Sequence, residues 1–475
     1  MLNVVLLFWL IRLSLPNGAR SGHFVPFLGA LLFAVHPITA ESVNWISGRS
    51  DLIAGMCLLS ATVALLAWRR KRSCWWLMLL GLMLATGGIL TKEPAWGFLA
   101  VLPLLLADPY DSTTHPLLEL YGRFTRLEKL MLLTAVSLCF LLAVVLLTFW
   151  PVIALSTILG LIVLYRKLRR TPLSRQTSLL IPGLLILIAA VIPFCVKLAK
   201  QSASSGSYYS SFSRTVLLIS LDFDNSIGLF SAAIAFYIKK FFLPLPLSFS
   251  ITDIAPGYLF AGIAVIILTA FLIAWRSQAA ILFLTGLALL LPALPLVHNQ
   301  IAWSPYAERY IYISSAFWIA SLAVASNAIT RPSLRVSCAT MCMTLIPIAA
   351  LISYKRSVLW QSNVTLFEDT VRKSPSHLEA RVLYMTALSK AGKLSEALGQ
   401  YKLIKADPSA WKRVTYFFDF AELLYKHGLM REAWDVLDTS LAIPLPLGQK
   451  HPLHNDDWQR LYKLHSRLRQ ELFPN

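Results

Sequence analysis

The stretch GYLFAGIAVIILTAFLIAWRSQAAILFLTGLALLLPALPL, residues 257–296, decides the fold class, because Arg276 is its only charged side chain. A helix needs about 20 apolar residues to cross the hydrocarbon core of a bilayer, so the stretch predicts two transmembrane helices, near 257–275 and 278–296. Across all 475 residues, 57% are hydrophobic and 14% are charged, whereas soluble domains have about 25% charged residues. The sequence therefore argues against a soluble enzyme and predicts an all-α, polytopic membrane protein.

Apolar segments separated by polar breaks predict about twelve spans in all. The other ten lie near residues 2–15, 23–37, 51–68, 74–91, 96–107, 128–149, 151–166, 178–198, 311–328 and 336–354. Residues 96–107 are short for a crossing. Residues 227–243 carry Lys239 and Lys240 ahead of a proline-rich segment, which predicts a helix at the outer interface or, equally, a re-entrant helix.

The basic residues lie mainly in the membrane part and set its orientation. Residues 1–360 hold 27 of the Lys and Arg residues and 11 of the Asp and Glu residues, so most of the formal charge of +19 lies there and needs no nucleic acid to explain it. Of these 27 cations, 17 fall in one alternating set of loops, which predicts that this set faces the cytoplasm. The opposite, outer set holds ten cations and seven of the acids, so we expect the chemistry on the outer face.

The composition becomes that of a soluble domain after Trp360, and an internal repeat appears there. Gly392, Ala397, Tyr401 and Pro408 recur 36 residues later as the set Gly428, Ala433, Leu437 and Pro444. Small residues at a helix crossing and a closing proline are typical of tetratricopeptide repeats, although an unrelated pair of helical hairpins would also fit. We therefore predict a membrane domain over residues 1–356 and a short tetratricopeptide solenoid over 357–475, on the non-cytoplasmic side.

Three outer loops carry the candidate substrate-binding residues. They are His36, Glu41, Arg49 and Asp51 in residues 36–51, Lys92 and Glu93 in residues 91–96, and Glu308 and Arg309 in residues 303–315. Charged groups at a membrane edge are costly unless they pair or bind a ligand, and a guanidinium suits a phosphate. The structural alternatives are helix ends at His36 and Asp51 with Glu41 paired to Arg49, and snorkelling of Lys92.

A metal site is a weaker prediction. Asp222 and Asp224 form a D-x-D pair that could hold a divalent cation over a diphosphate, or could cap the following helix. The chain has no nucleophile elbow, P-loop, HExxH or dinucleotide fingerprint, which argues against the standard hydrolases, ATP-driven pumps and redox enzymes. Few charges lie within the predicted spans, which argues against an ion-coupled transporter.

The order of four motifs resembles the transmembrane and tetratricopeptide-repeat-containing family, which is related to protein O-mannosyltransferases of the GT-C superfamily. The motifs are LLFAVHPITAESVNWISGRSDLIAG at 31–55, LTKEP at 90–94, LPLPLSFSITDIAPG at 243–257 and SPYAERYIYISS at 304–315. The resemblance covers most of residues 1–444. It implies a transferase that takes a sugar from a polyprenyl-phosphate donor on the lumenal or periplasmic face, with the repeats holding a protein acceptor.

The sequence departs from the family at its start. Family members place an acidic residue, which would act as general base, on the first outer loop. This chain opens at MLNVVLLFWLIRLSL, which resembles the second span, so we expect either a truncated start or a diverged member without its base.

The predicted function is transfer of a hexose, plausibly mannose, to a protein hydroxyl at a bacterial inner membrane or the endoplasmic reticulum. Arg49, Lys92 and Arg309 would bind phosphate, while Glu41, Asp51, Glu93 and Glu308 would orient the sugar or a metal; no residue is assigned as the base. The main alternative is an inactive membrane-anchored scaffold whose repeats recruit an exported partner. An oligosaccharide ligase or polymerase is disfavoured because the large Arg- and His-rich outer loop that it predicts is absent from the sequence.

Overall fold

The computed structural model describes residues 1–16, 22–71, 74–106, 223–252, 254–275, 277–298, 304–405, 407, 414–442 and 455–473. These residues form helices and connecting turns, with no β-strand among them. The spans predicted between 107 and 222 lie outside the described residues. The chain divides into two compact units, Met1–Leu247 with Asp253–Arg356, and Ser248–Thr252 with Ser357–Asn475.

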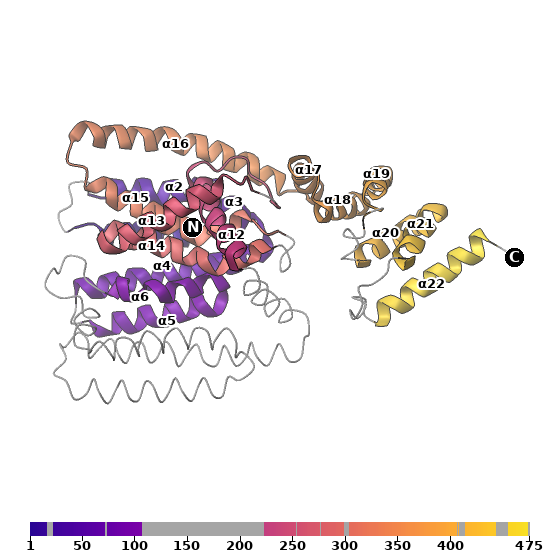
Figure 1. The fold of residues 1–475 in the computed structure, drawn as a ribbon, viewed down its shortest axis with the longest axis horizontal. Coiled ribbons are helices and arrows are strands. Elements are labelled where there is room, and N and C mark those ends of the chain that lie inside the picture. The colour runs from indigo at the N-terminus through magenta and orange to yellow at the C-terminus, as the bar shows by residue number, and fades with distance from the viewer. Residues whose placement is uncertain are drawn as a thin grey trace, which may run out of the picture. The chain divides into compact units, whose positions relative to one another are not determined.

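The first unit is a bundle of apolar helices (Figure 1). Its helices up to residue 106 are α1 (Leu2–Ser14), α2 (Phe24–Val35), α3 (Thr39–Asn44), η1 (Ile46–Gly48), α4 (Arg49–Arg70), α5 (Trp75–Thr91), η2 (Glu93–Gly97) and α6 (Phe98–Leu106). After residue 222 come α12 (Phe223–Phe242), α13 (Tyr258–Trp275), α14 (Gln278–Leu290), η3 (Leu291–His298), η4 (Glu308–Ile311), α15 (Tyr312–Asn327) and α16 (Pro332–Leu359).

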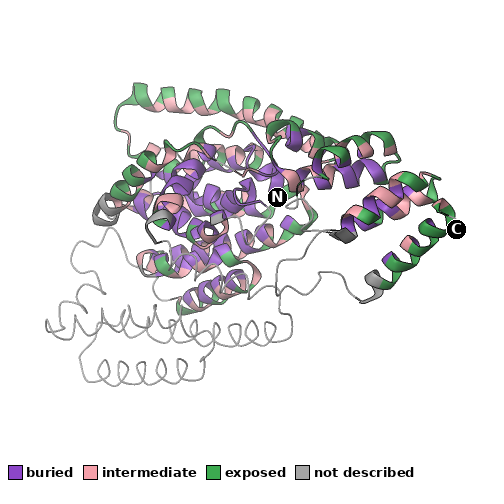
Figure 2. Ribbon diagram, turned by 45° about the vertical axis from the view of Figure 1, so that its right-hand side comes forward, coloured by how far each residue is buried: buried purple, intermediate pink, exposed green. Residues whose placement is uncertain are grey.

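Three helical segments among the described residues are long and apolar enough to cross a membrane: Ile46–Arg70, Gln278–Val297 and Pro332–Leu359. The last of these, α16, exposes its apolar side chains along most of its length (Figure 2), among them Met341, Leu345 and Ile348. An apolar helix exposed in this way is stable in lipid and would be unstable in water. The protein is therefore an all-helical membrane protein.

Helix α4 organises one half of the bundle. It packs against α1 and α5, and Gly81 and Gly88 of α5 bring the two helices close together, since a Cβ at either position would meet a leucine of α4. At the C-terminal end of α4, Arg70 donates hydrogen bonds to the carbonyls of Leu13 (2.9 Å) and Leu15 (2.5 Å). This end of α4 thus holds the end of α1 in place.

The centre of helix α12, which the sequence predicts at the outer interface or as a re-entrant helix, is enclosed by other parts of the protein. Residues 232–237 are all buried, so no face of its centre is open to solvent or lipid. Helix α12 packs against α13, η3 and η4. Its contact with α13 is close, because an added Cβ on Gly262 would lie 1.9 Å from the carbonyl oxygen of Ser231. Only a glycine permits this approach of one backbone to another.

The second unit is a series of short helices. They are α17 (Asn363–Lys373), α18 (Leu378–Lys390), α19 (Leu394–Ile404), α20 (Val414–Lys426), α21 (Met430–Ala442) and α22 (Asn455–Leu472). Consecutive pairs form two hairpins, α18 with α19 and α20 with α21. The segment Ser248–Thr252, which was not predicted to belong here, joins this unit: Phe249 packs edge-on against Trp360 (5.3 Å between ring centroids) and Phe367 (5.8 Å).

The offset of 36 residues corresponds to a repeated turn. Gly392 and Gly428 have φ of +77° and +79°, a left-handed conformation that other residues rarely adopt. In each turn the residue after the glycine donates its backbone N–H to the carbonyl five residues earlier, Lys393 to Leu388 and Leu429 to Leu424, both at 3.0 Å. This is the Schellman motif that ends many helices. The repeat read from the sequence therefore builds two helical hairpins with the same turn.

Candidate functional site

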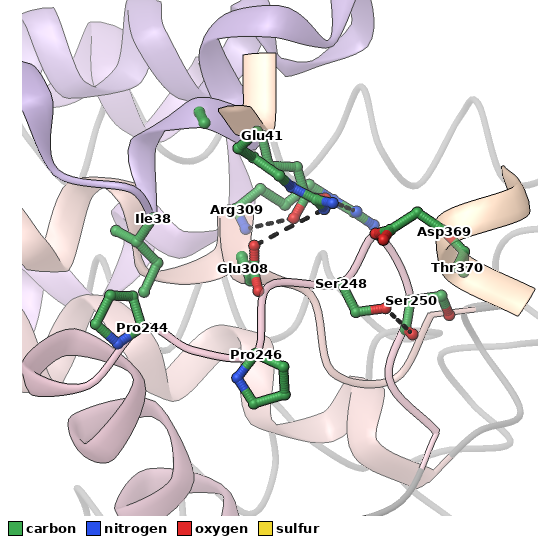
Figure 3. Close-up of polar contacts among 12 residues, drawn as sticks. Ile38, Glu41, Pro244, Pro246, Ser248, Ser250, Glu308, Arg309, Asp369 and Thr370 are labelled. Carbon is green, nitrogen blue, oxygen red and sulfur yellow. Dashed lines mark hydrogen bonds and ion pairs between the residues drawn. The ribbon is translucent and has the colours of Figure 1, made fainter. Parts of the chain in front are cut away.

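The loop after α2 and the loop before α15 meet through a buried ion pair. Glu41 on α3 accepts a hydrogen bond from Nη1 of Arg309 on η4 (2.5 Å) and a second one from the backbone N–H of Arg309 (3.2 Å). Both side chains are buried. Figure 3 shows Glu41, Arg309 and Glu308 close together. Two segments separated by 268 residues are thus joined at one point.

The guanidinium of Arg309 is surrounded by protein groups. It lies 4.6 Å above the ring of Trp45, and its Nη2 donates to the hydroxyl of Tyr310 at 3.3 Å. Burial disfavours its charged form, but the carboxylate of Glu41 outweighs burial and raises the pKa of Arg309. The partner of Glu41 is therefore Arg309 and not Arg49, the partner in the structural alternative. These contacts give Arg309 a structural role, whereas the sequence predicted only a contact with phosphate.

A second buried cluster adjoins the first through Glu308. Its carboxylate lies 3.1 Å from Nζ of Lys240 on α12 and 4.0 Å from Nη2 of Arg356 on α16. Lys240 also donates to the backbone carbonyls of Pro244 and Pro246. Burial lowers the pKa of Lys240, and Glu308 offsets only part of that effect.

Lys240 and Arg356 were not among the predicted site residues. The signal that could have found them is the alternation of charge, which assigns both to the same outer face as Glu308. Their distance from Glu308 along the chain left no local pattern to join the three.

His36 has a structural position. Its Nε2 donates to the carbonyl of Phe241 at 3.0 Å, and its Nδ1 accepts the N–H of Ile38 at 3.3 Å. Its ring also stacks on Phe241, with 5.5 Å between centroids. Because one ring nitrogen donates and the other accepts, the imidazole is neutral in this arrangement. His36 therefore attaches the end of α12 to the loop that carries Glu41.

The accessible edge of the site consists of Asp51, Lys92 and Glu93. Nζ of Lys92 lies 3.8 Å from Asp51 and 3.9 Å from Glu93, with side-chain exposures of 27%, 5% and 69% for Lys92, Asp51 and Glu93. Asp51 is close enough to Glu41 and Arg309 to interact electrostatically with both. Arg49, at the first position of α4, is exposed and has no ion pair with another described residue. The structure thus brings residues of all three predicted loops into one charged cluster.

The metal prediction cannot be placed in this cluster. Asp222 and the side chain of Asp224 lie outside the described residues. Among the residues that are described, no three His, Cys, Asp or Glu side chains gather in a way that could hold a metal ion. The cluster instead mixes acids with bases, which suits a ligand carrying both an anion and hydroxyl groups.

No protein-family model, curated protein or solved structure matches this chain. The fold and the site therefore define its class by themselves: an all-helical membrane protein with a buried charge cluster in its first unit and helical hairpins in its second.

Proposed function

We propose that the protein is a membrane glycosyltransferase of the GT-C type. It would move a hexose, which we propose is mannose, from a polyprenyl-phosphate sugar to a Ser or Thr hydroxyl of a protein on the lumenal or periplasmic face. The observation that carries the proposal is the convergence of Asp51, Lys92, Glu308 and Arg309, from three separate loops, on one cluster in an apolar helical bundle. In this reading the bundle has about twelve spans, and the cluster lies at its outer edge.

We assign a role to each charged residue of the cluster according to whether its side chain is accessible or buried. Lys92 and Arg49 are the accessible cations, so they would contact the donor phosphate and stabilise the charge that develops on it as the sugar leaves. Glu93 would bind sugar hydroxyls. The buried groups Glu41, Arg309, Glu308, Lys240 and Arg356 would hold the loops in register. Arg309, Glu41 and Glu308, which the sequence predicted to bind substrate, would thus support the loops instead.

The second unit would hold the protein acceptor. Its two hairpins share a turn and a 36-residue offset, as expected of a short tetratricopeptide solenoid, and such solenoids bind extended peptides on a concave surface. The acceptor would then reach the membrane unit as an extended segment rather than as a folded domain.

Transfer by the reconstituted full chain tests the proposal. In lipid nanodiscs with radiolabelled mannosyl-phosphoryl-polyprenol and a Ser/Thr-rich peptide, the wild type should label the peptide. Lys92→Ala should lower the rate by about 10² or more, as for loss of one charge-stabilising donor. The control is Lys71→Ala, which removes an exposed lysine at the other end of α4 and should keep full activity. A wild type that labels nothing refutes the function, and a Lys92→Ala enzyme as active as the control refutes the role of Lys92.

One observation favours the scaffold alternative. Arg309 is fully engaged by Glu41, Trp45 and Tyr310, which is also what a site that has lost its ligand would show. A scaffold predicts that the wild type transfers nothing and that all site variants keep the same interaction partners as the wild type.

A further inference from the structure

Asp51 is buried and incompletely bonded. Its side chain is 5% exposed, and its Oδ2 has no hydrogen-bond partner among the described residues. Its Oδ1 lies 3.8 Å from Nζ of Lys92, which is within range of an ion pair but longer than a hydrogen bond. A buried carboxylate oxygen without a donor costs free energy, so such an atom calls for an explanation such as a ligand or a proton.

The other carboxylates of the cluster are differently placed. Glu41 accepts two hydrogen bonds from Arg309. Glu308 is paired with Lys240 and Arg356. Glu93 is 69% exposed and therefore hydrated. Both carboxylate oxygens of Glu308 lie in ion pairs, Oε1 with Lys240 and Oε2 with Arg356. In Asp51 only Oδ1 faces a cation, Lys92, so its buried Oδ2 is the oxygen of the described cluster that is placed to take a new partner.

We propose that Asp51 is the proton acceptor of the transfer, a role that rests on the proposed function. The acceptor hydroxyl donates its proton to Oδ2 of Asp51 while its oxygen bonds to C1 of the sugar. The bond between C1 and the phosphate oxygen breaks, and the polyprenyl phosphate leaves with one more negative charge, next to Lys92. Protonation of Asp51 removes one of the two carboxylates that attract Lys92, the other being Glu93, so the ammonium group becomes freer to move towards the phosphate at the same step. Water later takes the proton from Asp51.

The test uses the full chain in lipid nanodiscs with mannosyl-phosphoryl-polyprenol and the same peptide. Asp51→Asn keeps the shape of the side chain but cannot take the proton, so transfer should fall by about 10²–10⁴. Donor binding, measured by native mass spectrometry of the nanodiscs, should stay within about threefold of the wild type. The matched control, Glu119→Gln, neutralises a carboxylate in the loop between the predicted spans 96–107 and 128–149, which charge counting assigns to the opposite face; its transfer should be unchanged.

Chemical rescue separates proton acceptance from a structural role. Asp51→Ala leaves space for a small carboxylate, so added formate should restore transfer by at least about tenfold. In the rescued enzyme, the decrease of kcat/KM at low pH should occur at the pH where formate is protonated, because formate then accepts the proton in place of Asp51. A purely structural aspartate gives no such rescue.

The results distinguish failure of the role of Asp51 from failure of the proposed function. An Asp51→Asn enzyme with wild-type transfer overturns the role of Asp51 and leaves the proposed function intact, as does an Asp51→Ala enzyme that formate does not rescue. A wild type that binds the donor but transfers nothing overturns the proposed function itself.

Discussion

At the scale of single residues, the charges of the cluster differ in what they contribute. Glu41 and Arg309 are both buried, so each lost its hydration on folding, and their attraction only repays that cost. Such a pair adds little to stability compared with two apolar residues of the same size. Removal of one partner is different, because it leaves the other charge buried and uncompensated. The pair therefore fixes which loops meet more than it raises the stability of the bundle.

Arg309→Ala should destabilise the first unit by about 3–5 kcal/mol, because Glu41 would remain buried without its partner. Replacement of both residues, Glu41→Leu with Arg309→Met, should recover most of this loss. The measurement is unfolding of the full chain in detergent, followed by proteolytic susceptibility.

Arg372→Ala is the control, since Arg372 is 75% exposed in its pair with Asp369 and an exposed pair contributes about 0–1 kcal/mol. If Arg309→Ala is no less stable than Arg372→Ala, the buried pair does not hold the two loops together.

At the scale of helices, the position of Lys240 depends on the contact between α12 and α13. Gly262 lies against the backbone of Ser231, with no room for a side chain. Lys240 sits near the end of the same α12, where Glu308 and two proline carbonyls hold its ammonium group. We therefore expect a displacement of α12 at Gly262 to shift Lys240 as well.

Gly262→Ala should separate α12 from α13 and lower both stability and transfer, with a stability loss of about 1–3 kcal/mol as for overpacking elsewhere. The matched control is Gly257→Ala, because a Cβ at Gly257 meets nothing within 4 Å. Thermal unfolding and peptide labelling of the two variants, measured side by side, check this expectation. Equal behaviour of the two variants would show that the close approach of α12 to α13 does not position Lys240.

At the scale of the whole molecule, the two ends of α4 have opposite characters. Its N-terminal turn carries Asp51 and adjoins the mixed cluster, whereas its last turn carries Arg69 and Arg70. The helix has 22 residues, a length of about 33 Å, which matches the hydrocarbon core of a bilayer. A crossing of this helix would place the cluster and the arginine end in different aqueous compartments, as cation counting predicts.

Labelling of single cysteines at the two ends should therefore show opposite sidedness. In a chain whose six native cysteines have been replaced, Arg49→Cys should react with a membrane-impermeant maleimide from the periplasmic or lumenal side. Lys71→Cys should react only after the membrane is permeabilised. Reaction of both positions from one side would mean that α4 does not cross the membrane.

Much of the fold follows from local sequence. Apolar runs predicted the helices of the first unit, because lipid requires every backbone group to bond within its own segment. The 36-residue offset predicted the paired hairpins of the second unit, because each left-handed glycine ends a helix locally. The cluster was predicted in part: charge alternation assigned Glu41, Asp51, Lys92, Glu308 and Arg309 to one face.

Only the tertiary structure decided which charged side chains form pairs and which segments are buried. No local pattern joins Glu41 to Arg309 across 268 residues, or Lys240 to Glu308 across 68. The same holds for the burial of α12 and for the attachment of Phe249 to Trp360 and Phe367. A charged side chain gains its partner from the way helices pack, and packing depends on all the residues around it. The sequence by itself thus determined which residues are helical and charged, and the tertiary structure decided which of them are buried in pairs and which, like Lys92, remain accessible to a ligand.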